Sequence, residues 1–194
     1  MTRKNVAKYG IILCILYFIV TFAFILTGLR SWLTAMELIT MISSIYMVML
    51  IVVLPFSTNE NQQIYKLLSI IFVASCMILS NVAHMVNLTV TEHLIRSDVS
   101  VPSYLQIGKW PSVEMAVDYL AWGLFMGLAY LVSSLGIETK ETNKMLKTTL
   151  IICGTLCLIG FFGSIIINEN MWYAAPMGYG IGTVVICLEL LKIG

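Results

Sequence analysis

The sequence predicts an all-α fold, namely a polytopic membrane helix bundle with six transmembrane helices. Hydrophobic residues make up 59% of the 194 residues and charged residues only 11%, and the mean hydropathy is +0.94. A soluble domain of this size carries far more charge on its surface. The apolar residues gather in six runs, each close to the roughly 20 residues that a helix needs to cross a bilayer. None of the runs alternates between apolar and polar residues over about ten positions, as a β-barrel strand would.

The six runs predict a single transmembrane domain over residues 1–194. In chain order, we expect the spans near residues 10–29, 32–56, 65–90, 113–136, 146–167 and 172–192. Because lipid offers the backbone no hydrogen-bond partner, each span must be a helix. The first run follows Arg3, Lys4 and Lys8 and so resembles a signal peptide. Its apolar stretch is too long and no small-residue cleavage site follows it, which predicts a retained first helix.

Prolines and one long connection mark the boundaries of the later spans. Pro55 ends the second span, and Pro176 lies in the first turns of the sixth. Proline is tolerated at such positions, so neither residue predicts a break in mid-membrane. The connection 91–112 mixes charged residues with apolar and aromatic ones such as Tyr104 and Trp110. Such a segment is expected to lie along the membrane surface or to fold back as a lid.

The distribution of basic residues predicts the orientation. Six spans put both termini on one side of the membrane, and that side carries eight of the eleven basic residues: Arg3, Lys4, Lys8, Lys66, Lys140, Lys144, Lys147 and Lys192. The opposite side carries Arg30, Arg96 and Lys109. Basic residues are enriched in cytoplasmic loops. The sequence therefore predicts a multi-pass protein of the cell membrane with both termini cytoplasmic and residues 91–112 external.

Several classes of function are disfavoured by what the sequence lacks. The net charge is +1, and no basic patch beyond the short N-terminal segment suggests a nucleic-acid partner. All five cysteines fall inside apolar runs, where a free cysteine behaves as a small hydrophobic residue. No catalytic signature such as H-E-x-x-H or Gly-x-Ser-x-Gly is present.

Three ionisable residues on three different spans are expected at one depth near the external surface. At 1.5 Å per residue, Glu37 lies about 8 Å inside the second span and Asp118 about 8 Å inside the fourth. By the same rise, His84 lies about 10 Å below the outer end of the third. Ionisable residues within a bilayer usually face the bundle interior and mark a functional site. The sequence therefore predicts a polar pocket open to the outside.

Helical spacing places further polar residues beside these three. On the third span, Ser80, His84 and Asn87 are followed by Thr91 at intervals of four, three and four residues, which is one face of a helix. On the fourth span, Glu114, Asp118 and Trp122 succeed one another by single turns. The candidate ligand-binding residues are Glu37, Ser80, His84, Asn87, Glu114, Asp118 and Trp122. The expected partners are the lipid bilayer and a small molecule or ion that enters from the external face.

Three functions remain open at this point. The polar residues can bind a ligand in a sensing, accessory or transport role, or they can serve only as hydrogen-bonded contacts between helices. An enzyme would use His84 and Asp118 as ligands of a divalent metal, or as an acid–base pair. A structural subunit would dock through small-residue faces instead, and the fourth to sixth spans carry three such motifs: Gly123-x-x-x-Gly127, Gly160-x-x-x-Ser164 and Gly178-x-x-x-Gly182. These faces would let spans four, five and six of one chain approach closely, or would suit a second copy or another membrane protein.

Part of the chain resembles a family of bacterial multi-pass membrane proteins. The resemblance covers residues 80–131 and rests on "HMVNLTV" (84–90), "WPS" (110–112) and "DYLAWGLFMGLAYL" (118–131). It implies a multi-pass helical fold and draws attention to His84, Asn87, Trp110, Asp118 and Trp122, but that family is uncharacterised and brings no function with it.

A second resemblance is more limited. Ser80-x-x-x-His84 and an aspartate on another span resemble part of the zinc site of seven-span hydrolases related to alkaline ceramidase. Their paired histidines on a late span have no counterpart here, because the only other histidine is His93.

Overall fold

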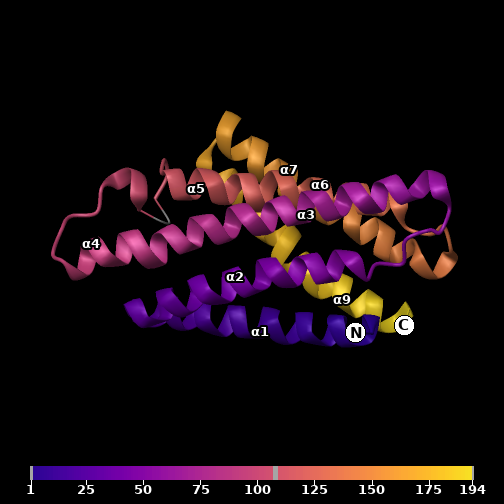
Figure 1. The fold of residues 1–194 in the computed structure, drawn as a ribbon, viewed down its shortest axis with the longest axis horizontal. Coiled ribbons are helices and arrows are strands. Elements are labelled where there is room, and N and C mark those ends of the chain that lie inside the picture. Colours follow the sequence, from indigo (N-terminus) through magenta and orange to yellow (C-terminus); the bar gives the residue numbers. More distant parts are fainter. Residues whose placement is uncertain (1, 107–108, 194) are drawn as a thin grey trace.

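A computed structural model describes residues 2–106 and 109–193, and over these residues the chain is helical without any β-strand (Figure 1). Six helical segments are long and apolar enough to cross a membrane, as the sequence predicts: Arg3–Thr27, Arg30–Val52, Glu60–Arg96, Val113–Gly136, Glu141–Ile166 and Glu169–Ile193. Their length and composition identify a multi-pass membrane protein surrounded by lipid.

Only the first two segments are single α-helices, α1 (Arg3–Thr27) and α2 (Arg30–Val52). The third joins α3 (Glu60–Val86), a π-helical turn η1 (Asn87–Thr91) and α4 (Glu92–Arg96). The fourth joins α5 (Val113–Asp118), the π-helix η3 (Tyr119–Phe125) and α6 (Met126–Gly136). The fifth is η4 (Glu141–Asn143) with α7 (Lys144–Ile166). The sixth joins η5 (Glu169–Tyr173), α8 (Ala174–Pro176), the π-helix η6 (Met177–Ile181) and α9 (Gly182–Ile193).

Several boundaries differ from those expected from the sequence. The first helix begins at Arg3 rather than near residue 10, and the third and fifth segments begin at Glu60 and Glu141 rather than near residues 65 and 146, because polar residues before the apolar runs are also helical. The second span ends at Val52 rather than near residue 56, because the chain turns there and Phe56 forms a bridge with Ile137. The third helix continues to Arg96 instead of ending near residue 90. The connection to the fourth span is therefore residues 97–112, of which 107 and 108 lie outside the described part. It contains one short helical turn, η2 (Ser103–Leu105).

Side-chain caps explain where several helices begin. The side chains of Thr2, Asn59 and Ser112 each accept a hydrogen bond from a backbone N–H in the first turn of the helix that follows. These contacts satisfy donors that the helix itself leaves unpaired. At the other end of α1, Gly28 adopts a left-handed conformation (φ 62°) and donates its N–H to the carbonyl of Phe24 at 2.8 Å. Glycine is the usual residue at such a helix end.

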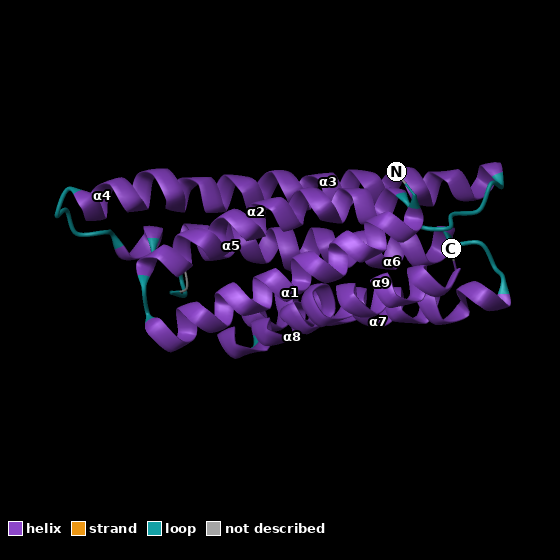
Figure 2. Ribbon diagram, turned by 90° about the horizontal axis from the view of Figure 1, so that it is seen from below, coloured by secondary structure: helices purple, strands orange, loops and turns teal. Residues whose placement is uncertain are grey.

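The six spans pack in the order of the sequence and close on themselves. Each span contacts the next, and α9 returns to pack against α1 (Figures 1 and 2). Both termini lie at one end of the bundle, which we call the terminal end (Figure 1). The other end, called the loop end, carries the segment 97–112. The apolar core between the helices includes Tyr130, Leu50, Ile51 and Met126, all fully buried.

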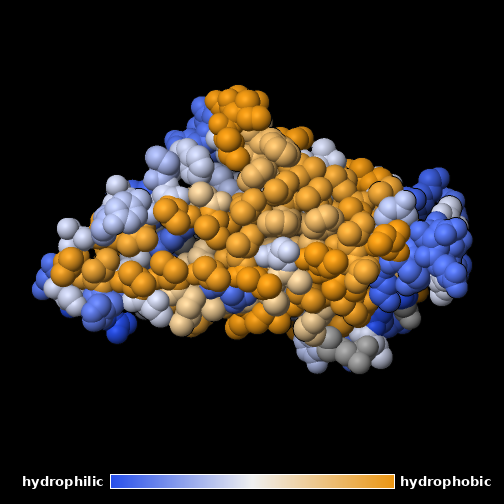
Figure 3. Space-filling view, turned by 45° about the horizontal axis from the view of Figure 1, so that its top comes forward, coloured by the Kyte–Doolittle hydropathy of each residue, from blue (hydrophilic) through white to orange (hydrophobic). Residues whose placement is uncertain are grey.

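The surface of the bundle matches a lipid environment. Apolar residues cover the middle of the molecule, and hydrophilic residues gather towards its two ends (Figure 3). Large apolar side chains on α1, such as Phe22 and Ile25, are 61% and 70% exposed. A soluble monomer rarely exposes so much contiguous apolar surface.

The small-residue faces of the later spans are occupied within the chain itself. A Cβ atom placed on Gly123 would lie 2.7 Å from the Cβ of Phe161, and one placed on Gly160 would lie 2.7 Å from the Cβ of Ala175. Gly127 faces α7 in the same way, and Gly178 and Gly182 face Cys157 and Cys153. The glycines bring spans four, five and six of one chain together. Of the alternatives left open by the sequence, these glycines thus pack within one chain, and a second copy or a membrane partner stays a prediction.

The side of the membrane on which the termini lie stays a prediction, and a reporter fusion tests it. We expect green fluorescent protein fused to the C-terminus to fluoresce and alkaline phosphatase at the same position to be inactive, because eight of the eleven basic residues favour a cytoplasmic terminal end. Insertion of the same reporters between Ser97 and Asp98 should give the opposite result. Active phosphatase at the C-terminus would contradict the orientation.

Candidate functional site

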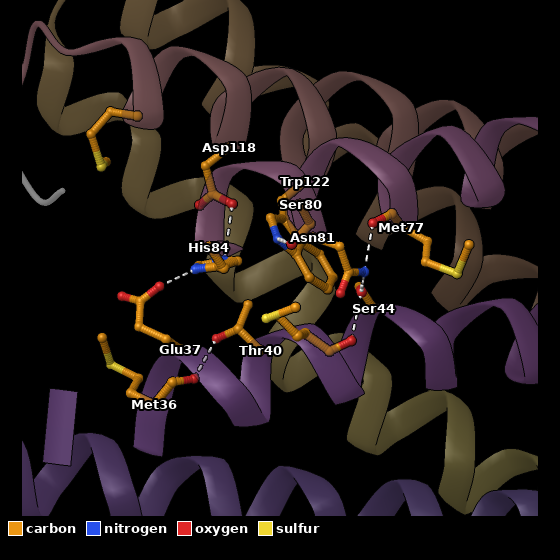
Figure 4. A network of polar contacts seen from close by, with 12 residues as sticks. Met36, Glu37, Thr40, Ser44, Met77, Ser80, Asn81, His84, Asp118 and Trp122 are labelled. Atoms are coloured by element: carbon orange, nitrogen blue, oxygen red, sulfur yellow. Dashed lines mark hydrogen bonds and ion pairs between the residues drawn. The ribbon is translucent and has the colours of Figure 1, made fainter. Parts of the chain in front are cut away.

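His84 lies between two carboxylates that come from different helices. Its Nδ1 atom contacts Oε2 of Glu37 on α2, and its Nε2 atom lies 3.5 Å from Oδ1 of Asp118 on α5 (Figure 4). The Glu37 and His84 side chains are 1% and 7% exposed, whereas that of Asp118 is 17% exposed. The structure thus brings together the three ionisable residues that the sequence places at one depth.

The helices present these side chains because polar residues recur on their inner faces. On α2, Glu37, Thr40 and Ser44 are all buried and lie three and four residues apart. The hydroxyl groups of Thr40 and Ser44 donate to carbonyls of their own helix, at 2.9 and 2.7 Å. A hydroxyl that bonds its own helix needs no partner elsewhere. The carboxyl group of Glu37 has no such local partner and reaches across to His84.

One helical turn further towards the centre of the bundle, hydrogen bonds join the helices to one another. Trp122 donates its indole N–H to the hydroxyl of Ser80 at 3.0 Å, one helical turn from Asp118 and His84 respectively. Asn81 donates to the hydroxyl of Ser44 at 2.7 Å and so joins α3 to α2 (Figure 4). Each such bond between membrane helices contributes on the order of 1 kcal/mol. These contacts fix the relative position of the three helices beneath His84.

On the side of the loop end, two further acids are buried. Oε1 of Glu114 lies 3.2 Å from the hydroxyl of Thr91, which is also 3.3 Å from the carbonyl of Leu105. Glu92 accepts hydrogen bonds from Nε of Arg30 at 2.9 and 3.0 Å. Asn87, a predicted site residue, is 3% exposed and opens η1 between these contacts and His84. The polar groups therefore continue from the Glu37–His84–Asp118 group to the loop end.

Two features of the site were not expected from the sequence. The first is the π-helical geometry of η1, η3 and η6, which all lie in the half of the bundle nearer the loop end. π-helical turns are rare in proteins, and many of those that do occur lie at functional sites. In η6 the run Pro176-Met177-Gly178 was a signal of irregular backbone, but nothing in the sequence marks η1. The helical spacing used for prediction cannot reveal one additional residue in a turn.

The second is an aromatic stack beside the site. The rings of Trp110 and Tyr119 stack at a centroid distance of 5.0 Å, and those of Tyr119 and Trp172 at 3.9 Å. Tyr179 lies against the Trp122 ring at 4.8 Å. Offset stacking contributes about 0.5–1.5 kcal/mol per pair. The stack attaches the segment 97–112 and the start of span six to η3, next to Asp118.

Several polar atoms at this site lack a hydrogen-bond partner. Among the described residues, they include Oε1 of Glu37, Nε2 of His84, Oδ1 of Asp118 and Oε2 of Glu114. A buried polar atom without a partner is costly, and native proteins contain few of them. Two of these atoms, Nε2 of His84 and Oδ1 of Asp118, face each other at 3.5 Å, whereas Oε1 of Glu37 and Oε2 of Glu114 have no hydrogen-bond partner of their own.

The geometry does not suit the divalent metal considered from the sequence. The carboxylates of Glu37 and Asp118 face opposite nitrogens of the His84 ring, so the three side chains do not converge on one point. Within the described ranges, no group of three or more His, Cys, Asp or Glu side chains could hold a metal ion. We therefore assign no metal to His84 and Asp118.

Neither of two hollows found on the surface of the described residues is lined by a residue of the cluster. The two clearest surface hollows of the described chain both lie at the terminal end, one beside Gln63 and Lys66 and the other beside Lys140 and Lys144. An opening from the loop end to His84 therefore stays a prediction.

No family model matches the chain, and no curated protein or solved structure is significantly similar to it. The resemblance of residues 80–131 to bacterial multi-pass proteins stays an expectation.

Proposed function

We propose that the protein binds a small molecule or ion, reached from the external face of the membrane, at the cluster of Glu37, His84, Asp118 and Glu114. The role would be sensing, accessory or transport. One observation carries this proposal, which is the set of buried carboxyl and imidazole atoms without hydrogen-bond partners. Contacts that served only to hold helices together would be expected to satisfy these atoms.

The charge of the cluster favours a positively charged ligand. Three carboxyl groups surround one imidazole, and Glu114 interacts electrostatically with both Glu37 and His84. No Lys or Arg of the described residues forms an ion pair with these carboxyl groups. Arg30, which lies on the same helix as Glu37, pairs with Glu92 instead. An ionised cluster would be negative even with His84 protonated. Burying net charge among apolar helices is costly, and a bound cation removes the excess.

Thermal unfolding of the detergent-solubilised protein tests this proposal. We expect at least one of the monovalent cations Na⁺, K⁺ and choline to raise the apparent melting temperature of the wild type. At a concentration of about 100 times Kd, binding stabilises the folded state by about 2.7 kcal/mol. For a chain of this size that corresponds to roughly 5–10 °C. The increase should be absent in Glu37→Gln and in Asp118→Asn, which lack the negative charge.

Glu189→Gln is the matched control. Glu189 is also a buried carboxylate on a membrane span, but it pairs with Lys192 at 2.7 Å and lies at the terminal end. This variant should respond to the cation as the wild type does. If Glu37→Gln and Asp118→Asn lose stability but respond to every probe like the wild type, the cluster serves helix packing alone.

A further inference from the structure

We infer that His84 relays a proton between Asp118 and Glu37. The inference uses the same cluster as the proposed function but requires no bound ligand. It rests on the arrangement of the two carboxylates, each of which faces a different nitrogen of one imidazole ring.

An imidazole ring can accept a proton at one nitrogen and release another from the second. In the starting state Asp118 is protonated, Glu37 is ionised and His84 carries its proton on Nδ1. The Asp118 carboxyl gives its proton to Nε2, and the Nδ1 proton passes to Oε2 of Glu37. The products are an Asp118 carboxylate, a protonated Glu37 and a His84 ring with its proton on Nε2. One proton has crossed the ring, and the number of protons in the cluster is unchanged.

The burial of the side chains gives the relay a direction. The Asp118 side chain is 17% exposed and that of Glu37 only 1% exposed. Asp118, the more exposed of the two acids, is the side on which the relay exchanges protons with its surroundings, and Glu37 is the interior acceptor. Because the total charge is the same before and after transfer, the relay avoids placing an additional charge among apolar helices.

The surrounding contacts keep the His84 ring between the two acids. The distance between His84 and Asp118 can still change. The Trp122–Ser80 and Asn81–Ser44 hydrogen bonds hold the adjacent turns together. The 3.5 Å between Nε2 and Oδ1 exceeds a normal hydrogen bond, and both atoms lack another partner. A small movement of the Asp118 side chain completes or interrupts the relay. Catalytic hydrogen bonds are often long in the resting state and shorten when they act.

Other titratable groups near the relay also contribute to its electrostatics. Glu114 on α5 faces both Glu37 and His84. Tyr17 on α1 interacts electrostatically with Glu37 and Asp118, and Tyr179 on η6 interacts with Asp118. A pH dependence of the relay therefore belongs to the whole group rather than to His84 alone.

Nitrogen NMR of ¹⁵N-histidine-labelled protein in lipid bilayers tests the relay. The chain contains two histidines, so a His93→Gln background leaves His84 as the only labelled ring. We expect both neutral tautomers of His84 in this protein, in exchange with each other. Asp118→Asn should leave only the Nδ1-protonated form, which faces the Glu37 carboxylate. Glu37→Gln should leave only the Nε2-protonated form. The two variants identify the signal of each tautomer, and the exchange between both tautomers in the protein with both acids distinguishes the relay from a fixed contact, which would show one form.

Two results would overturn the relay. One is an imidazolium signal at every pH at which the protein stays folded, and the other is the same single tautomer in all three proteins. If a variant fails to fold, the spectrum of the His93→Gln protein alone tests the relay. A single tautomer of His84 in that spectrum would exclude exchange and so refute the relay. The result is separate from cation binding, since a fixed imidazolium combined with an intact response to cations refutes the relay and retains the proposed function.

Discussion

Replacing His84 with alanine is expected to lower the free energy of unfolding by several kcal/mol, because each of two buried carboxyl groups left without its partner costs about 1–3 kcal/mol. The substitution leaves the carboxyl groups of Glu37 and Asp118 facing a cavity, and neither has another hydrogen-bond partner at the atoms concerned. Reversible unfolding in mixed detergent micelles measures this loss. His84→Gln should lose less, because an amide can still donate to one carboxylate and approximates the size of the ring.

His93→Ala is the matched control for this substitution. His93 lies on α4, nine residues further along the same helical segment, and its side chain is exposed. Its removal should change the free energy of unfolding by less than about 0.5 kcal/mol, as is usual for surface positions. Equal losses in the two alanine variants would mean that the contacts of His84 contribute nothing to stability.

Gly178→Ala is expected to destabilise the bundle by about 1–3 kcal/mol, the usual cost of overpacking a well-packed core. A Cβ atom at this position would lie 2.5 Å from the carbonyl oxygen of Cys153 and 2.9 Å from the sulfur of Cys157. The backbone oxygen cannot rotate away as a flexible side chain can, so η6 and α7 must separate. The same unfolding measurement records the loss.

Gly180→Ala provides a control within the same π-helix. A Cβ atom on Gly180 would meet nothing within 4 Å, so this variant should unfold like the wild type. Because η6 also carries Tyr179, which packs against Trp122, Gly178→Ala should in addition alter the fluorescence of Trp122. A Gly178→Ala protein as stable as Gly180→Ala would contradict the close packing of η6 on α7.

The two substitutions affect different parts of the molecule. His84→Ala removes a polar contact among α2, α3 and α5, whereas Gly178→Ala disturbs apolar packing between the last two spans. The cation response described above should survive Gly178→Ala in the fraction that stays folded, because none of the four residues proposed to bind the ligand changes. Loss of that response in both variants would indicate a general disruption of the fold.

Much of the architecture could be predicted from the sequence, because lipid imposes simple rules on it. Six apolar runs predict six membrane helices, and these are observed. The helical spacing of Ser80, His84, Asn87 and Thr91 also identifies a buried face, since all four are at most 6% exposed. Counting residues from the expected helix ends places Glu37, His84 and Asp118 at one level, and the three do come together, although the third segment continues to Arg96 beyond the end from which His84 was counted.

The contacts formed by residues distant in sequence could not be predicted in the same way. Glu92 was considered part of an external loop, but it begins α4 in the third helical segment, and Arg30 binds it from α2. The aromatic stack joins Trp110, Tyr119 and Trp172, which are separated by up to 62 positions, and nothing in the local pattern of any one of them indicates the others. The use of Gly160 and Gly178 within one chain, rather than against a partner, also depends on which helices are neighbours.

The sequence by itself determined the solvent, the number of spans and the residues that must avoid lipid, because hydrophobicity and helical period act locally along the chain. Only the tertiary structure decided that the two carboxylates face opposite nitrogens of His84, and not a common point where a metal could bind. That choice depends on the rotation and register of α2, α3 and α5 against one another. Packing and hydrogen bonds between residues distant in sequence determine this rotation and this register. The sequence of one segment alone reveals neither the rotation nor the register.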